Sequence, residues 1–136
     1  MSNFIISTDN APKAIGPYVQ GLDLGQFVII SGQIPVDPKT NTIPNKIEDQ
    51  VCLSLNNIKA ILEKAKLKVN NIVKIKIFMI NLNDFEIMNK KYQQFFLKHK
   101  ATYPVRSCVE VSRLPKDVKI EIEATAVRFL SQFKEY

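Results

Sequence analysis

The sequence of 136 residues contains no tryptophan, a single histidine and only two cysteines, and each scarcity narrows the possible chemistry. His99 stands alone in a polar, lysine-rich segment, so neither a histidine metal cluster nor a Ser-His-Asp triad can be assembled. Cys52 and Cys108 lack CxxC and Cys/His metal spacing. We therefore expect no metal site and two reduced thiols.

Long hydrophobic runs are also missing. No apolar stretch approaches the roughly 20 residues that span a bilayer, and residues 1–8 lack the basic start and long apolar core of a signal peptide. Hydrophobic residues nevertheless make up 46% of the chain, enough for one domain over residues 1–136 with a substantial core. We expect a cytoplasmic protein that does not insert into membranes.

Arginine is scarce in a chain that is otherwise basic, with 16 Lys, 3 Arg and a net charge of +6. The lysines are scattered, and no combination of aromatic and basic residues resembles an RNA-binding platform. Because Ile (17) and Asn (11) are also abundant, the charge reflects a general compositional bias, and we expect no specific nucleic-acid partner. A retained arginine then indicates a need for its planar, two-pronged guanidinium.

Hydrophobic periodicity predicts six strands and two helices. The strands are expected at residues 4–6, 18–22, 27–31, 73–80, 105–111 and 118–125, and the helices at residues 46–66 and from Asp84 onward. Asp84 is the expected N-cap of the second helix, and Asn89 lies off its buried stripe. That stripe is expected to contain Phe85, Met88, Tyr92 and Phe95 or Phe96. The order predicts an α+β fold in which both helices cover one face of a single sheet layer.

Residues 103–124 carry the densest chemistry in the sequence. Alternation places Val105 and Val109 on one face of a strand and Arg106 and Cys108 on the other, while Glu121 stands on the polar side of the next strand. We interpret this as packing on one face and chemistry on the opposite face. The alternative is a half-buried sheet whose second face is simply solvated.

Helices on only one side of the sheet leave its other face open. We expect this face to carry Phe78, Arg106, Cys108, Glu121 and Val127, a mixture too apolar to remain in water. This pattern predicts an oligomer with sites at its interfaces.

Tyr18 and Gly32 each permit two interpretations. Tyr18 follows Gly16-Pro17 and is either an aromatic fixed beside a ligand or a tyrosine of the core. Gly32, between Ser31 and Gln33 at the end of a strand, either lets the backbone approach a ligand closely or forms a β-bulge.

Four stretches resemble one known family over essentially the whole chain. They are APKAIGPYVQG (residues 11–21), ISGQIPVDP (30–38), NNIKAILEKA (56–65) and PVRSCVEVSRLPKDVKIEIEA (104–124). The sequence is similar to the Rid family of reactive-imine deaminases, in particular the RidA subgroup. The resemblance implies a chorismate-mutase-like fold and a homotrimer. It also implies three clefts between subunits that hydrolyse 2-imino acids to 2-keto acids, without a cofactor.

Site residues follow from the resemblance by position. Arg106 is expected to hold the substrate carboxylate and Glu121 to transfer protons. The cleft is expected to be lined by Tyr18, Ser31, Gly32, Asn89 and Cys108. The implied fold also places strand 73–80 between the two signature segments. The chain departs from the family pattern at Val19, Gly21 and Lys66, and Lys66 leaves the end of the first helix open.

Two functions fit this inventory. A hydrolase of 2-iminobutanoate and 2-iminopropanoate needs an anion clamp, a proton-transfer carboxyl and a water, since an imine is already electrophilic. The alternative is a non-catalytic protein that binds and senses a small 2-keto acid. Glu121 favours the hydrolase, because a passive receptor gains nothing from a carboxylate near its ligand. Without a histidine base, Cys108 is expected to line the cleft rather than attack, and RNA cleavage or holdase activity ranks last.

Overall fold

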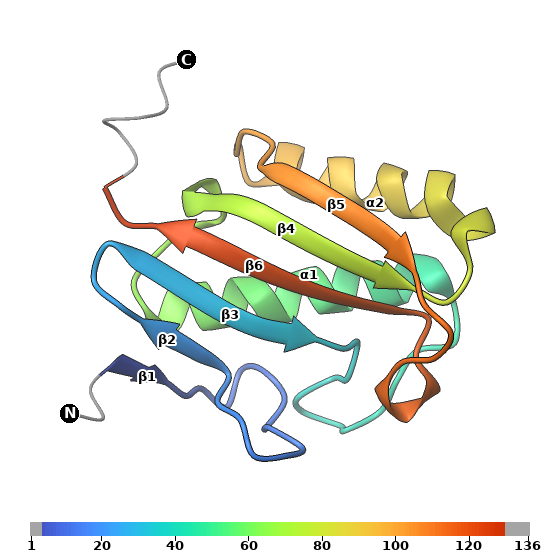
Figure 1. Cartoon of the computed structure of the whole chain (residues 1–136), viewed down its shortest axis with the longest axis horizontal. Helices are drawn as coiled ribbons and strands as arrows, with labels where there is room; N and C mark the ends of the chain where they lie inside the picture. The colour runs from blue at the N-terminus through green and yellow to red at the C-terminus, as the bar shows by residue number, and fades with distance from the viewer. Residues whose placement is uncertain (1–3, 130–136) are drawn as a thin grey trace.

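The computed structural model describes residues 4–129, which form one mixed sheet with two helices on a single face (Figure 1). The strands are β1 (Ile5–Ile6), β2 (Gly21–Asp23), β3 (Phe27–Gln33), β4 (Ile72–Met79), β5 (Val105–Glu110) and β6 (Ile120–Val127), and the helices are α1 (Ile47–Lys64) and α2 (Phe85–Lys98). The strand order is β1-β2-β3-β6-β4-β5, with only β4 and β5 parallel. The predicted α+β architecture is confirmed, as is the placement of β4 between β5 and β6.

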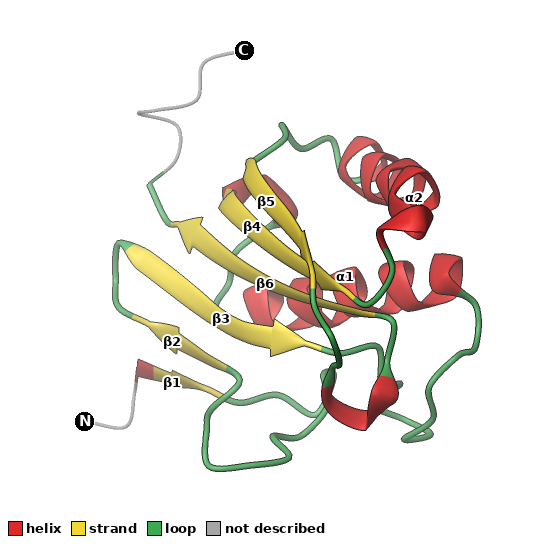
Figure 2. Ribbon diagram, turned by 45° about the vertical axis from the view of Figure 1, so that its right-hand side comes forward, coloured by secondary structure: helices red, strands yellow, loops and turns green. Residues whose placement is uncertain are grey.

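The core lies between the sheet and the helices, which Figure 2 shows stacked on the same side. Alternate residues of the central strands and one stripe of α1 supply its fully buried side chains, because strand and helix periodicities each gather apolar residues on one face. These residues include Ile30, Leu55, Ile58, Ile61, Leu62, Ile75, Ile77, Met79 and Ile120.

Helix α1 ends at a C-terminal motif that includes Lys66, the residue that left the end of this helix open in the sequence. Lys66 adopts a left-handed conformation with φ of 63°, which is usually reserved for glycine at this position. The N–H of Lys66 donates to the carbonyl of Glu63, and the N–H of Leu67 donates to that of Leu62, both at 2.9 Å. These two bonds form a Schellman motif, so the helix stops where a glycine would have stopped it.

Helix α2 differs from its prediction at its first turn. Asp84 occupies the N-cap position, but its side chain caps no backbone N–H. Instead, Asn81 accepts a hydrogen bond from the N–H of Asn83 at 2.9 Å and caps the short 3-10 turn Leu82–Asp84 before the helix. Phe85 is 37% exposed rather than buried, whereas Met88, Tyr92, Phe95 and Phe96 form the buried stripe.

The open face of the sheet carries exposed apolar side chains among charged ones, but its residues are not all those predicted. Phe27 (50%), Ile29 (44%), Val105 (69%) and Val109 (43%) are exposed there, beside the partly buried Phe78. A face of this composition is typical of a protein–protein interface.

Arg106 and Cys108 lie on the covered face, so their predicted placement beside Glu121 on the open face is wrong. They pair with Ile75 and Ile77 of β4, whose side chains are fully buried under the helices. The prediction failed because it assigned the packing face of β5 to its valines. The long arginine side chain instead packs its stem under α2, and the valines point outward.

The N-terminal strands also shift relative to the sequence prediction. Strand β2 covers Gly21–Asp23 rather than residues 18–22, so Tyr18 falls in the preceding loop. Strand β3 continues to Gln33 and changes register between Ile30 and Gln33, which places Gly32 at a bulge.

Candidate active site

Glu121 lies in a concave pocket of about 310 Å³ on the open side of the sheet. Tyr18, Ser31, Gly32 and Glu121 line it together with Ile15 and Pro115. We call this the Glu121 pocket. It brings together four of the seven site residues expected from the sequence, and they come from the loop before β2, the bulge in β3 and the start of β6.

Burial raises the pKa of the Glu121 carboxyl above its ordinary value, and the neighbouring negative charge of Glu123 raises it further. Both effects disfavour the ionised form. A carboxyl group whose pKa moves toward neutrality can both accept and return a proton near physiological pH.

Gly32 allows the backbone to approach Glu121 closely. A Cβ atom at residue 32 would overlap the Glu121 carboxylate group, whose Cδ would lie only 2.9 Å away. The two interpretations of Gly32 are therefore compatible, because the bulge is the device that brings the backbone against the carboxyl.

Tyr18 is 46% exposed, so its interpretation as a core tyrosine is wrong. Its hydroxyl accepts a hydrogen bond from the N–H of Ile15 at 3.1 Å, and its own N–H donates to the carbonyl of Gly16 at 2.9 Å. The Ser31 hydroxyl donates to the carbonyl of Val19 at 2.6 Å and fastens this loop to β3. The loop thus holds the Tyr18 ring over the Glu121 pocket.

Gln20, which no sequence pattern singled out, is buried and organises the same loop. Its amide nitrogen donates to the carbonyls of Thr8 (3.0 Å) and Pro12 (2.8 Å), and its amide oxygen accepts from the N–H of Thr8 (2.7 Å). A polar residue next to a predicted strand gave no sign of this role, because its partners lie 8 and 12 positions away in the chain.

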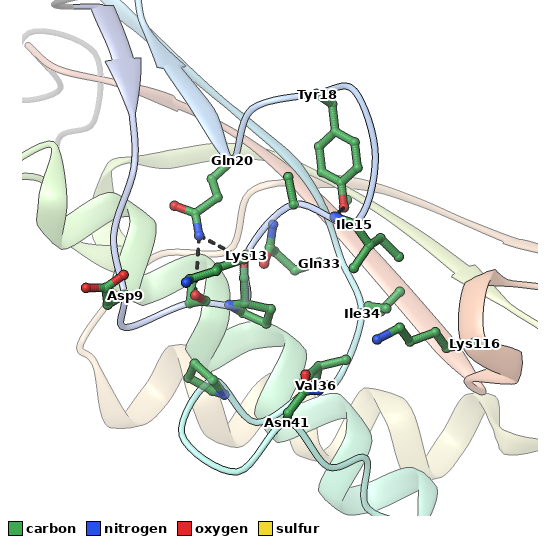
Figure 3. Close-up of a pocket in the computed structure, with 15 residues that line it drawn as sticks. Asp9, Lys13, Ile15, Tyr18, Gln20, Gln33, Ile34, Val36, Asn41 and Lys116 are labelled. Carbon is green, nitrogen blue, oxygen red and sulfur yellow. Dashed lines mark hydrogen bonds between the residues drawn. The ribbon is translucent and has the colours of Figure 1, made fainter.

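A larger cavity of about 590 Å³ adjoins the Glu121 pocket and shares Ile15, Tyr18 and Gly32 with it (Figure 3). Lys13 and Lys116 reach it from different segments, and Gln20 and Gln33 form part of its wall. Neither Arg106 nor Glu121 lines this cavity. Its size therefore does not mark it as the place of reaction.

Arg106 lines a separate pocket of about 390 Å³ with Asn89, Tyr92, Gln93, Tyr103 and Pro104. We call this the Arg106 pocket. The guanidinium carbon lies 4.9 Å from the centroid of the Tyr92 ring and 5.6 Å from that of Phe85. The ion pairs within residues 4–129 are Lys59–Glu63, Arg113–Asp117 and Arg128–Asp23, so Arg106 has no acidic partner there. An unpaired guanidinium in a concave pocket is suited to binding a carboxylate.

Asn89, which the family resemblance assigns to the cleft, lines the Arg106 pocket. Its side-chain oxygen is buried, and neither this atom nor the Tyr92 hydroxyl has a hydrogen-bond partner within residues 4–129. Cys108 does not line this pocket in a single chain. It packs against the core and donates a weak hydrogen bond to the Met79 sulfur at 3.7 Å. Burial raises the pKa of Cys108, which keeps the thiol protonated and weakens it as a nucleophile.

The two pockets open on opposite faces of the sheet. Glu121 pairs with Phe78 and Arg106 pairs with Ile75, three positions apart along β4 and therefore on different faces. Strand β4 separates them in the sheet. One chain therefore cannot bring Arg106 and Glu121 to the same small substrate.

Residues 4–129 contain no cluster of three or more His, Cys, Asp or Glu side chains arranged to hold a metal ion. Within the same range, neither helix combines the length and hydrophobicity needed to cross a bilayer.

Fold and pockets define an α+β protein in which an arginine without an acidic partner among residues 4–129 and a carboxyl of raised pKa line two separate pockets. Comparison with known families gives a match over residues 8–128 to the family described as Endoribonuclease L-PSP. The chain belongs to this family.

Its relatives are more specific. The 2-iminobutanoate/2-iminopropanoate deaminase of Salmonella typhimurium is 63% identical over 90% of this chain and 96% of its own length, and the Escherichia coli K12 protein of the same name is 62% identical. Among solved structures, E. coli TdcF with bound serine has a TM-score of 0.90 at 60% identity, covering 91% of this chain and 98% of its own. RidA from Psychrobacter sp. PAMC 21119 has a TM-score of 0.85 at 36% identity, covering 91% and 98%. The resemblance to the RidA group is confirmed.

Proposed function

We propose that this protein is a hydrolytic deaminase that converts small 2-imino acids, 2-iminobutanoate and 2-iminopropanoate, to 2-keto acids and ammonia. The observation that carries the proposal is the half-buried Glu121 carboxyl held against Gly32, with its pKa raised by burial. The deaminase names of relatives more than 60% identical point to the same reaction. TdcF binds serine, a small molecule with the same α-carboxylate as the proposed substrates.

The reaction needs no cofactor, because the imine carbon is already electrophilic. Arg106 binds the substrate carboxylate through paired hydrogen bonds. The imine nitrogen takes up a proton from solvent, and Glu121 accepts a proton from water as the water oxygen bonds to the imine carbon, which gives a neutral carbinolamine. Glu121 then returns its proton to the amine nitrogen, the C–N bond breaks and ammonia leaves, while the hydroxyl proton passes to solvent as the carbonyl forms.

The reacting groups must come from two copies of the chain, since Arg106 and Glu121 lie on opposite faces of one sheet. The open face of the sheet, where Phe27, Val105 and Val109 are exposed, supplies the surface for assembly. We place the site in clefts of a homotrimer. In each cleft one copy contributes Tyr18, Ser31, Gly32 and Glu121, and its neighbour contributes Asn89, Arg106 and Cys108.

A coupled assay tests the proposal directly. A threonine dehydratase generates 2-iminobutanoate, and the appearance of the keto acid is followed with and without this protein. We expect faster keto-acid formation with the protein. Glu121→Gln should lose about 10²–10⁴ of the rate, the usual range for general acid–base catalysis, while binding 2-ketobutyrate with nearly unchanged affinity.

The sensing hypothesis makes the opposite prediction. If the unmodified protein binds 2-ketobutyrate but does not accelerate imine hydrolysis, or if Glu121→Gln hydrolyses at the full rate, the protein is a keto-acid receptor.

The two free cysteines among the described residues are compatible with the reducing cytoplasm in which we place the reaction.

A further inference from the structure

The surroundings of Arg106 are unusual for a partly buried arginine. A guanidinium removed from water normally pairs with a carboxylate, because an unpaired buried charge is costly. Arg106 has no such partner within the described range. Two aromatic rings lie close to it instead, both within the roughly 6 Å over which a cation is attracted to a ring face.

Both rings come from one face of α2. Phe85 and Tyr92 are seven residues apart, which is two helical turns, and Asn89 lies between them on the same face. This spacing sets the rings side by side along the helix, where the Arg106 side chain from the neighbouring edge strand β5 contacts both.

Tyr92 is anchored more firmly than a contact with Arg106 alone would require. Its ring is 5% exposed and packs against Phe96 with a centroid distance of 4.7 Å. Phe96 in turn contacts Phe95 at 5.4 Å and Tyr103 at 6.2 Å. A ring held in this row of aromatics offers a fixed surface to the cation.

We propose that Phe85 and Tyr92 are positioning residues that hold the Arg106 guanidinium against their rings and keep its N–H groups free for the substrate carboxylate. An acidic partner would stabilise the cation equally well but would occupy the donors that bind substrate. Attraction to ring faces stabilises the charge without consuming donors. This inference rests on the proposed function, since it assigns to Arg106 the carboxylate of the imino acid.

The test measures binding of 2-ketobutyrate by calorimetry, together with KM and kcat in the coupled assay. Tyr92→Leu and Phe85→Leu should each weaken 2-ketobutyrate binding and raise KM by about 2- to 30-fold, the span of cation–π contributions. Tyr92→Phe keeps the ring and should remain within about twofold of the unmodified protein, since removing a buried hydroxyl that lacks a partner costs little. Phe95→Leu is the matched control, because Phe95 lies on the same helix and packs in the same row without a contact to Arg106.

A double-mutant cycle separates positioning from general support of the fold. If Tyr92 acts through Arg106, adding Tyr92→Leu to Arg106→Ala should change kcat/KM by less than about twofold beyond Arg106→Ala alone. An equal loss in both backgrounds overturns the proposal. Should Tyr92→Leu fail to fold, Phe85→Leu carries the same test at a residue that is 37% exposed.

The outcomes also distinguish this inference from the function on which it rests. If Arg106→Ala abolishes 2-ketobutyrate binding while Phe85→Leu and Tyr92→Leu bind normally, the rings have no positioning role and the deaminase proposal stands. If neither the unmodified protein nor any variant hydrolyses the imine, the deaminase proposal fails. The calorimetric titrations with 2-ketobutyrate still decide whether the rings support carboxylate binding.

Discussion

Glu121 and Glu123 are alternate residues of β6, and the negative charge of Glu123 contributes to the raised pKa of Glu121. In the proposed mechanism the ionised form of Glu121 accepts the proton from water, so activity should fall as the pH drops through its pKa. Glu123→Gln removes a like charge, which lowers the pKa of Glu121. We expect the acid limb of the kcat/KM profile to move to lower pH, measured in the coupled assay across the acidic range. A limb that moves to higher pH, or stays in place, would contradict this assignment.

Gly32 offers a second test at the scale of single residues. Gly32→Ala places a methyl group where the Glu121 carboxylate lies, so the carboxyl must shift. A displacement of about 1 Å at a reacting group can cost on the order of 10²-fold in rate, and we expect a loss of that size in kcat/KM.

Gly25→Asn is the matched control for Gly32→Ala. Gly25 has a φ of 87° and no atoms near its missing Cβ, and asparagine tolerates such backbone angles better than most residues. This variant should keep its activity. If Gly32→Ala is as active as Gly25→Asn, the close approach of residue 32 to Glu121 does not affect catalysis.

At the scale of elements, the end of α1 carries a residue whose conformation suits another side chain better. Lys66 holds φ of 63° in the Schellman motif, and glycine adopts this angle without the steric cost that Cβ imposes. We expect Lys66→Gly to raise the free energy of unfolding by about 0.5–1 kcal/mol. Denaturant titration measures it. Lys64→Gly, placed inside the last helical turn, should instead lower stability by about 1 kcal/mol. If Lys66→Gly lowers the free energy of unfolding, the left-handed conformation of Lys66 carries no steric cost.

Local patterns predicted the elements well because each depends on neighbours in sequence. The stripe of α1 from Val51 to Leu62 and the alternation of Ile75 and Ile77 were sufficient to place a helix and a strand. Loops were harder. Gln20 fixes the N-terminal loop, and Asn57 donates to the carbonyl of Val36 at 3.0 Å across 21 residues. Such long-range side-chain bonds leave no periodic signal in a sequence.

The site shows the same limit. Resemblance to the family supplied Arg106 and Glu121, and alternation correctly showed that Arg106 and Val105 point to opposite sides of β5. Alternation could not tell which of these two sides the helices cover. The side on which Arg106 lies is set by its tertiary contacts with Phe85 and Tyr92. In the sequence these two residues appear only as part of the helical pattern of α2.

At the scale of the whole molecule, the separation of the two pockets has a consequence for mixtures of inactive variants. In the proposed homotrimer, Arg106→Ala and Glu121→Gln each damage every cleft when all three copies carry the same variant. In a mixed trimer, one cleft joins an intact Arg106 from one copy to an intact Glu121 from its neighbour. Random assembly at equal amounts makes about three-quarters of the trimers mixed, each with one restored cleft of three, so about a quarter of full activity should return.

The two variants are co-expressed with different tags, purified through both tags in turn, and assayed beside each variant alone, with sedimentation to measure the size of the assembly. Purification through both tags selects mixed trimers, so activity per trimer should approach one-third of that of the unmodified protein.

The matched control pairs Glu121→Gln with Gly32→Ala. Both changes lie in the Glu121 pocket, so no mixture of them restores a complete cleft, and activity should stay at the level of the single variants. A site built within one chain predicts no recovery from either pair. Recovery from both pairs would instead mean that mixing changes the assembly, and only recovery confined to the first pair places Arg106 and Glu121 in the same cleft from different copies.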